Sequence, residues 1–301
     1  MRFRLAAVVV AMLLGGCAVR SETQLSAGTD AVPTPERVAI PGVPDGTVMN
    51  FPAIDPVDGS LWFSIYRGED FNRQTLVRAP YQEGWWGIPV PVILTRDDRW
   101  GARAPRFSPD GQRLYFTSNR PRSASDTVPN WNIWSAERRG TWWGDLVSLP
   151  APVNTDATEI HAAATAAGDL FVPSRRGGSL GLTDIWLVRR RGDGWDVPLH
   201  LPAPINDERS QPDLWVAPDG SWMVLVVTDH PQGLGGDDLF ISRFVNGAWS
   251  TPVHLPAPIN GPGYEYGPSV SPDGRMLYFN SERDGGVAIY RVPVSALSRY
   301  R

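Results

Sequence analysis

The sequence contains no lysine and only one cysteine, and its hydrophobic runs are short. All 28 basic residues are therefore arginine, and they form no basic run that would predict a nucleic-acid partner. The single cysteine, Cys17, excludes an internal disulfide and a cysteine metal cluster. We accordingly expect no cofactor and no metal site. The net charge of -4 excludes few classes of partner.

The longest apolar stretch, residues 5–14, is too short for a comfortable membrane span. It follows Arg2 and Arg4, so residues 1–16 are predicted to be a signal peptide. The residues Leu14-Gly15-Gly16-Cys17 resemble the bacterial lipobox, in which the cysteine is lipidated and becomes the mature N-terminus. An ordinary signal peptide with a chance cysteine is the alternative.

The resemblance to lipoproteins also implies a location. Ala18 rather than Asp follows the cysteine, which in that family implies sorting to the outer membrane. We expect a protein anchored by its N-terminal lipid, palmitate included, to the periplasmic side of the outer membrane. Residues 17–37 are rich in Ser, Thr, Gly, Pro and charge, so they are predicted to be a flexible tether before a folded domain at 38–301.

Internal repetition dominates the rest of the chain. A turn glycine precedes an apolar strand five times, with spacings of 52, 57, 52 and 54 residues, at Gly59, Gly111, Gly168, Gly220 and Gly274. Each unit continues with a second apolar strand, four units add a Trp-containing strand, and three end in LPAPVN or LPAPIN. Four short strands in each unit are typical of a β-propeller blade rather than of a helical repeat.

The repeated motif also resembles a known family. The segment SPDGQRLYFTSNR, followed by NIW, a Trp strand and LPAPVNT, is similar to the WD-like repeat of the TolB β-propeller and its relatives. The resemblance covers about Val38 to Tyr300 and implies the fold, but it implies no activity. The third unit departs from the motif, with Ala-Ala-Gly in place of Ser-Pro-Asp-Gly, and the first unit is the most divergent.

The fifth unit stops at Tyr300 without its Trp strand and Pro-rich tail. Residues 38–45 look like such a tail without its beginning, so an N-terminal strand is expected to complete the last blade. The prediction is an all-β chain forming one β-propeller of five four-stranded blades. The alternative of six blades would need roughly 50 additional residues.

Strand topology assigns the loops to two faces. The Pro-Asp-Gly turns share one face, whereas the links between blades and the loops between second and third strands share the other, where propellers usually bind. Charged residues on that second face are the candidate binding residues. They are Glu159, Glu208, Arg209 and Glu265 on the links and Arg67, Arg120, Arg176, His230 and Arg283 on the loops. These Glu and Arg residues could equally form salt bridges between blades, and their recurrence favours that structural role.

Catalytic patterns are weak. Gly177 to Gly181 matches the G-x-S-x-G nucleophile motif at Ser179, but a strand follows it instead of a helix. Glu159 and His161 lack a third metal ligand, and His200 and His254 share one repeat position, which indicates a structural role.

Two functions remain as hypotheses. The first is a non-enzymatic module that binds an envelope protein or glycan. The alternative is a carbohydrate-active enzyme, similar to propeller glycoside hydrolases, that uses the carboxylates of Glu159, Glu208 and Glu265 at the channel mouth. The Trp residues recur at the same position of the repeat, which indicates that they belong to the core of the blades rather than to a surface that stacks on sugars.

Overall fold

The computed structural model describes residues 32–68, 70–94, 99–127 and 130–300. Residues 32–301 form one compact unit. The predicted signal peptide, the lipidation site Cys17 and residues 17–31 of the predicted tether lie outside the described residues. No helix in the described part of the chain is long and apolar enough to cross a membrane.

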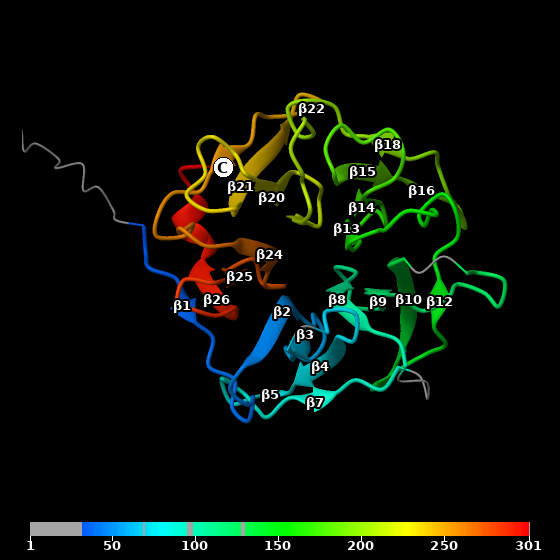
Figure 1. Cartoon of the computed structure of the whole chain (residues 1–301), viewed down its shortest axis with the longest axis horizontal. Helices are drawn as coiled ribbons and strands as arrows, with labels where there is room; N and C mark the ends of the chain where they lie inside the picture. The colour runs from blue at the N-terminus through cyan, green and yellow to red at the C-terminus, as the bar shows by residue number, and fades with distance from the viewer. Residues whose placement is uncertain (1–31, 69, 95–98, 128–129, 301) are drawn as a thin grey trace, which may run out of the picture. The chain divides into compact units, whose positions relative to one another are not determined.

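Five antiparallel sheets of the described residues are arranged as blades around an axis (Figure 1), and two further sheets, β5–β6 (residues 81–86) and β16–β17 (residues 190–195), have two strands each. Blade 1 contains β2 (Thr47–Ile54), β3 (Leu61–Arg67), β4 (Thr75–Ala79) and β7 (Val90–Pro91). Blade 2 contains β8 (Ala102–Phe107), β9 (Arg113–Ser118), β10 (Asn132–Arg139) and β12 (Val147–Ser148). Blade 3 contains β13 (Ala163–Ala164), β14 (Leu170–Ser174), β15 (Asp184–Val188) and β18 (Leu199–His200).

Blade 4 contains β19 (Leu214–Val216), β20 (Trp222–Thr228), β21 (Asp237–Val245) and β23 (Val253–His254). Blade 5 contains β24 (Glu265–Val270), β25 (Met276–Ser281) and β26 (Ala288–Pro293), followed by the short helix η1 (Val294–Leu297). Small strands extend the outer turns, namely β5 (Tyr81–Gln82), β6 (Trp85–Trp86), β11 (Trp142–Trp143), β16 (Arg190–Arg191), β17 (Gly194–Trp195) and β22 (Ala248–Trp249).

The fourth strand of blade 5 comes from the beginning of the described chain. Strand β1 (Glu36–Arg37) pairs antiparallel with β26, and the Val38 N–H donates to the Ile289 carbonyl at 2.8 Å. This pairing covers the edge of β26, which would otherwise expose unpaired backbone groups. It confirms the predicted five-bladed propeller closed by an N-terminal strand, with the pairing centred just before the segment 38–45.

The repeated LPAPVN and LPAPIN tails have a structural explanation in their asparagines. The Asn260 carboxamide accepts from the Leu239 N–H at 2.9 Å and donates to the carbonyls of Leu239 at 2.9 Å and Leu255 at 2.6 Å. Asn154 and Asn206 make the equivalent contacts in the two preceding tails. Each asparagine thus satisfies backbone groups of a third strand where the short fourth strand ends. An Ala–Pro bond in each tail is cis.

The Trp residues of the repeat belong to the blade packing, as predicted. Trp86, Trp143, Trp195 and Trp249 each pack against a different hydrophobic cluster. The Trp143 ring, for example, meets Trp62 of the previous blade edge-on at 5.9 Å. The four tryptophans therefore stabilise contacts between and within blades.

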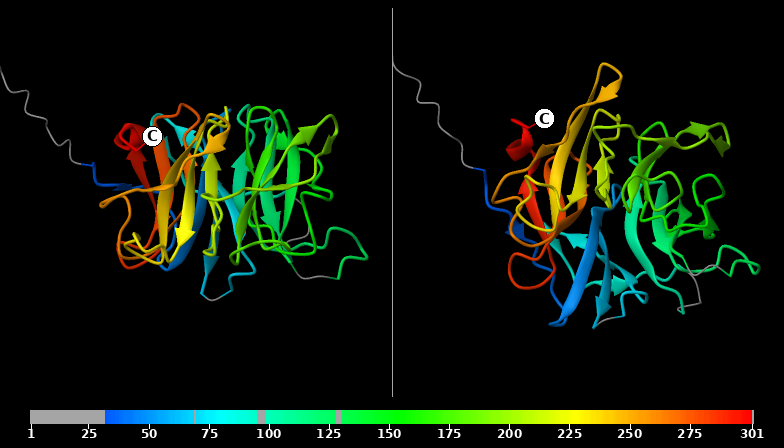
Figure 2. Two further views of the ribbon diagram at one scale, coloured as in Figure 1. Left: turned by 90° about the horizontal axis from the view of Figure 1, so that it is seen from above. Right: turned by 45° about the horizontal axis from the view of Figure 1, so that its top comes forward.

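Figure 2 shows the blades from the side, with loops gathered at the two ends of the ring. The turn glycines Gly111, Gly220 and Gly274 adopt φ of 69°, 71° and 71° in the tight turns that join first and second strands. We call the opposite face the loop face. It carries the links between blades and the loops between second and third strands.

Candidate functional site

The first strand of a blade lies nearest the axis of the ring, and in three blades this strand is interrupted by a shift in register. The first strands of blades 5, 1 and 2 contain a register shift, with Gly267, Phe51 and Ala104 at φ of 64°, 55° and 52° inside it. The repeats align these three residues with His161 of blade 3 and Asp213 of blade 4. One backbone position therefore carries a different side chain in every blade, and two of the five are titratable.

Asp213 lies at the centre of a buried polar cluster. Its Oδ1 is 2.5 Å from the His161 Nε2 and 3.4 Å from an Arg106 nitrogen, and it accepts from the Leu214 N–H at 2.9 Å. Its Oδ2 accepts from the Gly267 N–H at 2.8 Å. Three donors thus converge on Oδ1 and a fourth binds Oδ2.

The protonation states of this cluster follow from its burial. Burial alone would raise the pKa of Asp213, but the hydrogen bonds and charges of His161 and Arg106 outweigh burial and hold that pKa below its ordinary value. Burial lowers the pKa of His161, although Asp213 opposes the shift. The Leu214 N–H also approaches the His161 Nε2 at 3.3 Å, so His161 and Asp213 share this donor within the buried cluster.

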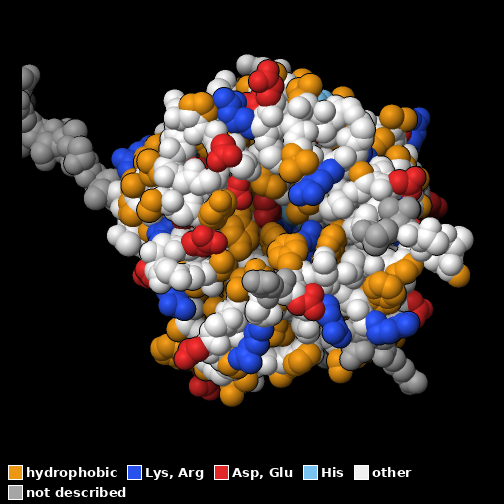
Figure 3. Space-filling model, viewed as in Figure 1, with side chains coloured by type: hydrophobic (Ala, Val, Ile, Leu, Met, Phe, Trp, Pro, Cys, Tyr) orange, Lys and Arg blue, Asp and Glu red, His pale blue; other side chains and the backbone are white. Residues whose placement is uncertain are grey.

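A basin opens on the loop face above this cluster. It has a volume of about 410 Å³. Its lining combines aromatic, acidic and basic side chains with a few small polar and aliphatic groups, namely Asn50, Phe51, Tyr66, Phe71, Arg103, Trp131, Thr158, Ile160, Arg175, Pro212, Asp213, Asp237, Tyr264, Tyr266 and Glu282. Figure 3 shows a hollow at the middle of this face, with hydrophobic side chains around it and acidic and basic side chains beside them.

The Arg106–Asp213 pair separates the basin from a second cavity. Asp213 lines the basin, whereas Arg106 lines a cavity of about 420 Å³ that also contacts Trp215, Trp222 and the turn at Pro272. Arg106 also donates to the carbonyls of Pro52, Pro105 and Pro268, at 3.4, 3.1 and 3.4 Å. The Arg106–Asp213 pair therefore lies between the two cavities and is held by contacts with residues of all five blades.

Arg103 forms one wall of the basin. Its guanidinium lies 4.0 Å from the ring centre of Trp131 and 4.9 Å from that of Phe71, and the residue is only 5 % exposed. Among the described residues its Nε has no hydrogen-bond partner, and no carboxylate forms an ion pair with it. Burial is the main cause that lowers the pKa of Arg103 to about 10; the charge of Arg175 adds to the shift and Asp213 opposes it.

The opposite wall is acidic. Burial raises the pKa of Asp237, although the carboxylate accepts from the Thr228 hydroxyl at 2.6 Å. Glu282 lies on the same side, from the loop after β25. Tyr266 donates its hydroxyl to the Asn50 Oδ1 at 2.6 Å, which fixes its ring across the gap between blades 5 and 1. The basin thus has a basic side from blades 2 and 3 and an acidic side from blades 4 and 5.

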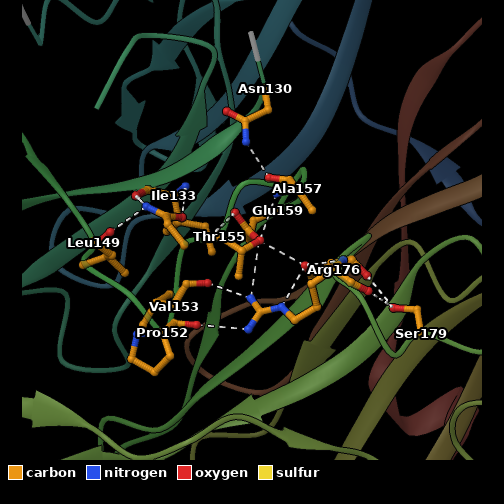
Figure 4. A network of polar contacts seen from close by, with 12 residues as sticks. Asn130, Ile133, Leu149, Pro152, Val153, Thr155, Ala157, Glu159, Arg176 and Ser179 are labelled. Atoms are coloured by element: carbon orange, nitrogen blue, oxygen red, sulfur yellow. Dashed lines mark hydrogen bonds and ion pairs between the residues drawn. The ribbon is translucent and has the colours of Figure 1, made fainter. Parts of the chain in front are cut away.

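Two of the sequence-predicted glutamates lie below the surface. Glu159 is fully buried, and its Oε1 is 3.4 Å from the Arg176 Nη2 (Figure 4). The same guanidinium donates to the carbonyls of Pro152 at 3.0 Å and Val153 at 2.7 Å, in the tail of the preceding blade. Thr155 donates its hydroxyl to the Glu159 carboxylate at 2.7 Å. These hydrogen bonds and the ion pair connect blade 3 to blade 2.

Glu265 and Arg283 repeat the arrangement at the junction of blades 4 and 5. Their charged atoms are 3.6 Å apart, and Arg283 donates to the carbonyls of Pro258 and Ile259. Burial raises the pKa of both Glu159 and Glu265, while hydrogen bonds and the neighbouring arginines oppose the shift. The Glu–Arg pairing considered from the sequence is therefore present in both junctions.

The other predicted residues are spread over the loop face. Arg67 donates to the Thr47 hydroxyl, Arg209 pairs with Asp207 at 2.5 Å, and Glu208 is exposed. The His230 ring packs on Phe240 at 4.7 Å, and Arg120 lies over the Trp134 ring at 5.6 Å.

None of the nine predicted binding residues lines the basin in the described part of the protein. Three of the residues that do, Phe71, Trp131 and Tyr264, are loop aromatics outside the repeat pattern. That departure from the repeat is the sequence signal that could have found them.

The catalytic and metal patterns have structural roles. The Ser179 hydroxyl donates to the carbonyls of Ser174 and Arg176 in the loop between β14 and β15, so it lies in no nucleophile elbow. His200 and His254 contact Asp184 at 2.6 Å and Asp238 at 3.3 Å. Within the described ranges, no group of three or more His, Cys, Asp or Glu side chains could hold a metal ion.

Comparisons with solved structures agree with the fold. This chain is similar to a structure described as a glycoside hydrolase, with a TM-score of 0.59 and 11% identity over 87% of this chain and 91% of that one. It is also similar to a structure described as an RGII complex of BT0996, with a TM-score of 0.58 and 13% identity over 87% and 91%. The fold is a five-bladed β-propeller.

TolB from Acinetobacter baumannii is also among the similar structures, with a TM-score of 0.49 and 18% identity. That match covers 81% of this chain and 54% of TolB, so this chain spans about half of the TolB length. No protein-family model matches this chain, and no curated protein sequence matches it. At these identities the similarity establishes the fold alone.

Proposed function

We propose that this protein is a non-enzymatic binding module of the bacterial envelope, anchored by a lipid on Cys17 to the periplasmic side of the outer membrane. Its partner is an envelope glycan or protein that contacts the loop face. The observation that carries the proposal is the basin itself, a concave site on the axis with six aromatic rings and with acidic and basic side chains.

The chemistry of the basin favours a glycan over a protein. Aromatic faces pack against the apolar faces of sugar rings, and carboxylates and amides accept or donate hydrogen bonds to hydroxyls. Phe71, Trp131 and Tyr264 supply rings from loops, whereas Asp237 and Glu282 supply acceptors. A cavity of about 410 Å³ is of the size that holds a small ligand or a short segment of a polymer.

Hydrolysis of a glycan is the second candidate function. It is favoured by one observation, that Asp213 and Asp237 share the basin while their pKa values shift in opposite directions. The contacts of Asp213 argue against it, because its Oδ1 accepts from three donors and its Oδ2 from a fourth, in a residue that is only 2 % exposed. Glu159 and Glu265 are buried against arginines, so they face no substrate.

The test uses the domain from Val32 onwards and fluorescently labelled envelope glycan fragments and envelope proteins. We expect the wild type to retain a glycan fraction without shortening it and the double variant Trp131→Ala, Tyr264→Ala to lose it. Release of shorter saccharides that depends on Asp237 would instead establish hydrolysis. Retention of protein alone would assign a protein partner, and equal retention by the double variant would remove the basin as the site.

The anchor is tested separately in the full chain. A Cys17→Ser variant is expected to lose incorporation of labelled palmitate and to leave the membrane fraction after cell lysis. Unchanged lipid labelling in that variant would show that Cys17 is not the modified residue. A Ser21→Ala variant in the predicted tether is the control, since it alters a neighbouring polar residue without touching the thiol.

A further inference from the structure

Arg103 is an unusual buried charge because aromatic rings flank it and, among the described residues, no carboxylate forms an ion pair with it. Its guanidinium lies between Trp131 and Phe71, at 4.0 and 4.9 Å from their ring centres. Stacking of this kind stabilises the cation and fixes its plane, but it satisfies none of its N–H donors. A buried charge that lacks hydrogen bonds is costly unless a partner arrives.

The neighbouring charges do not supply that partner. The Asp213 carboxylate already accepts from His161 and Arg106, and among the described residues it forms no ion pair with Arg103. Arg175, which also lines the basin, brings a second positive charge. Its Nε reaches only the Thr183 hydroxyl at 3.4 Å, and within the described ranges no carboxylate pairs with it. In the part of the chain that the structure describes, two guanidinium groups therefore share one wall of the basin and neither is paired with a carboxylate.

We propose that Arg103, with Arg175, binds the carboxylate of an acidic sugar, so that the glycan ligand of the basin is a uronic-acid saccharide. This inference rests on the proposed glycan-binding function and names the class of its ligand. A guanidinium presents parallel N–H donors that match the two oxygens of a carboxylate.

The rest of the basin suits the remaining parts of such a ligand. Trp131 and Tyr264 present rings beside the guanidinium wall, where a sugar ring would lie. Asp237 and Glu282 lie on the opposite side, as acceptors for hydroxyl groups. The acidic wall also disfavours a ligand that carries negative charge at both ends, so a single acidic sugar bound with its carboxylate towards blade 2 fits the distribution of charge.

Isothermal titration calorimetry of the domain from Val32 onwards tests the inference with three probes, namely a trisaccharide of one galacturonate and two neutral galactose residues, the methyl ester of that trisaccharide and inorganic phosphate. Esterification removes the charge and leaves the sugar rings. The informative variant is Arg103→Met, which keeps an unbranched side chain between Trp131 and Phe71 but removes the guanidinium. Arg175→Gln tests the second cation, and Arg113→Gln, far from the basin in an exposed pair with Glu137, is the matched control.

The wild type is expected to bind the acid trisaccharide at least about ten-fold more tightly than the ester. Arg103→Met should lose that preference, Arg175→Gln should reduce it, and Arg113→Gln should keep it. Urea denaturation verifies that Arg103→Met remains folded. A further variant, Arg103→Lys, keeps the positive charge but lacks the planar guanidinium, so it should retain only part of the preference for the acid.

The outcomes separate this inference from the proposed function. Equal binding of acid and ester, unchanged in Arg103→Met, would overturn the carboxylate site while leaving glycan binding intact. Phosphate bound as tightly as the acid sugar, with no effect of Trp131→Ala, would assign the wall to a free anion and overturn the sugar assignment. Failure of either saccharide to bind, while the envelope glycan fraction is still retained, would overturn the uronic-acid class alone.

Discussion

Glu159 and Arg176 form a buried ion pair, with 3.4 Å between the Glu159 Oε1 and the Arg176 Nη2, at the junction of blades 2 and 3. Arg176 simultaneously binds two carbonyls of the preceding blade. The pair therefore joins two repeats that share no strand pairing. Three predictions about stability concern charges of this kind, and a fourth concerns the tails that precede them.

Glu159→Ala should destabilise the domain by about 3 kcal/mol, because it leaves the Arg176 guanidinium buried without its carboxylate. The free energy of unfolding from urea titration measures the effect. The control is Glu137→Ala, which removes an exposed partner of Arg113 and should cost less than about 1 kcal/mol. Equal effects of the two substitutions would contradict a structural role for the buried pair.

Glu159→Gln should keep the fold, because Gln211 occupies the equivalent position in blade 4. Its effect should depend on pH. Burial raises the pKa of Glu159 in the folded state, so the stability that the wild type derives from this group is present below the ordinary value of 4.5 and is lost as the pH rises through the folded pKa. The stability of the variant minus that of the wild type should therefore increase with pH above 4.5. A difference that decreases with pH would show that the folded pKa is lowered instead.

His161 should give a pH dependence of the opposite sign. Its pKa is lowered in the folded state, chiefly by burial, so the unfolded chain takes up the proton first as the pH falls below the ordinary value of 6.5. The wild type should lose stability relative to His161→Gln between pH 6.5 and the folded pKa. Denaturant titrations at pH 8, 6 and 5 measure this difference. A constant difference over that range would mean that the imidazole does not change its protonation on unfolding.

Asn260→Ala should destabilise blade 4 by about 2 to 4 kcal/mol, because it removes three buried hydrogen bonds to backbone groups of Leu239 and Leu255. Thermal and urea unfolding report the loss. Asn72→Ala, at an exposed loop position, is the matched control and should change the free energy of unfolding by less than about 0.5 kcal/mol. If both substitutions are neutral, the repeated tail does not act through its asparagine.

Much of the fold is local and could therefore be predicted. The turn at Gly111 and its counterparts, the alternating strands that follow and the Trp strands recur within each unit, so their spacing reveals the blades and their number. The incomplete fifth unit likewise predicts closure by β1. The pairing of Glu159 with Arg176 and of Glu265 with Arg283 could also be predicted, because a glutamate on the link and an arginine on the loop recur in both units.

The sequence alone thus determined the five blades, their closure and the face that carries the loops, since each follows from contacts within or between adjacent repeats. Only the tertiary structure decided what lies on the axis. His161, Asp213 and Gly267 occupy one repeat position, yet their side chains differ, and Arg103 lies beside Trp131 from another loop. The repeat pattern reveals what the blades have in common and does not reveal these positions. Closure of the ring brings the five positions together at the axis, where their different side chains form the site.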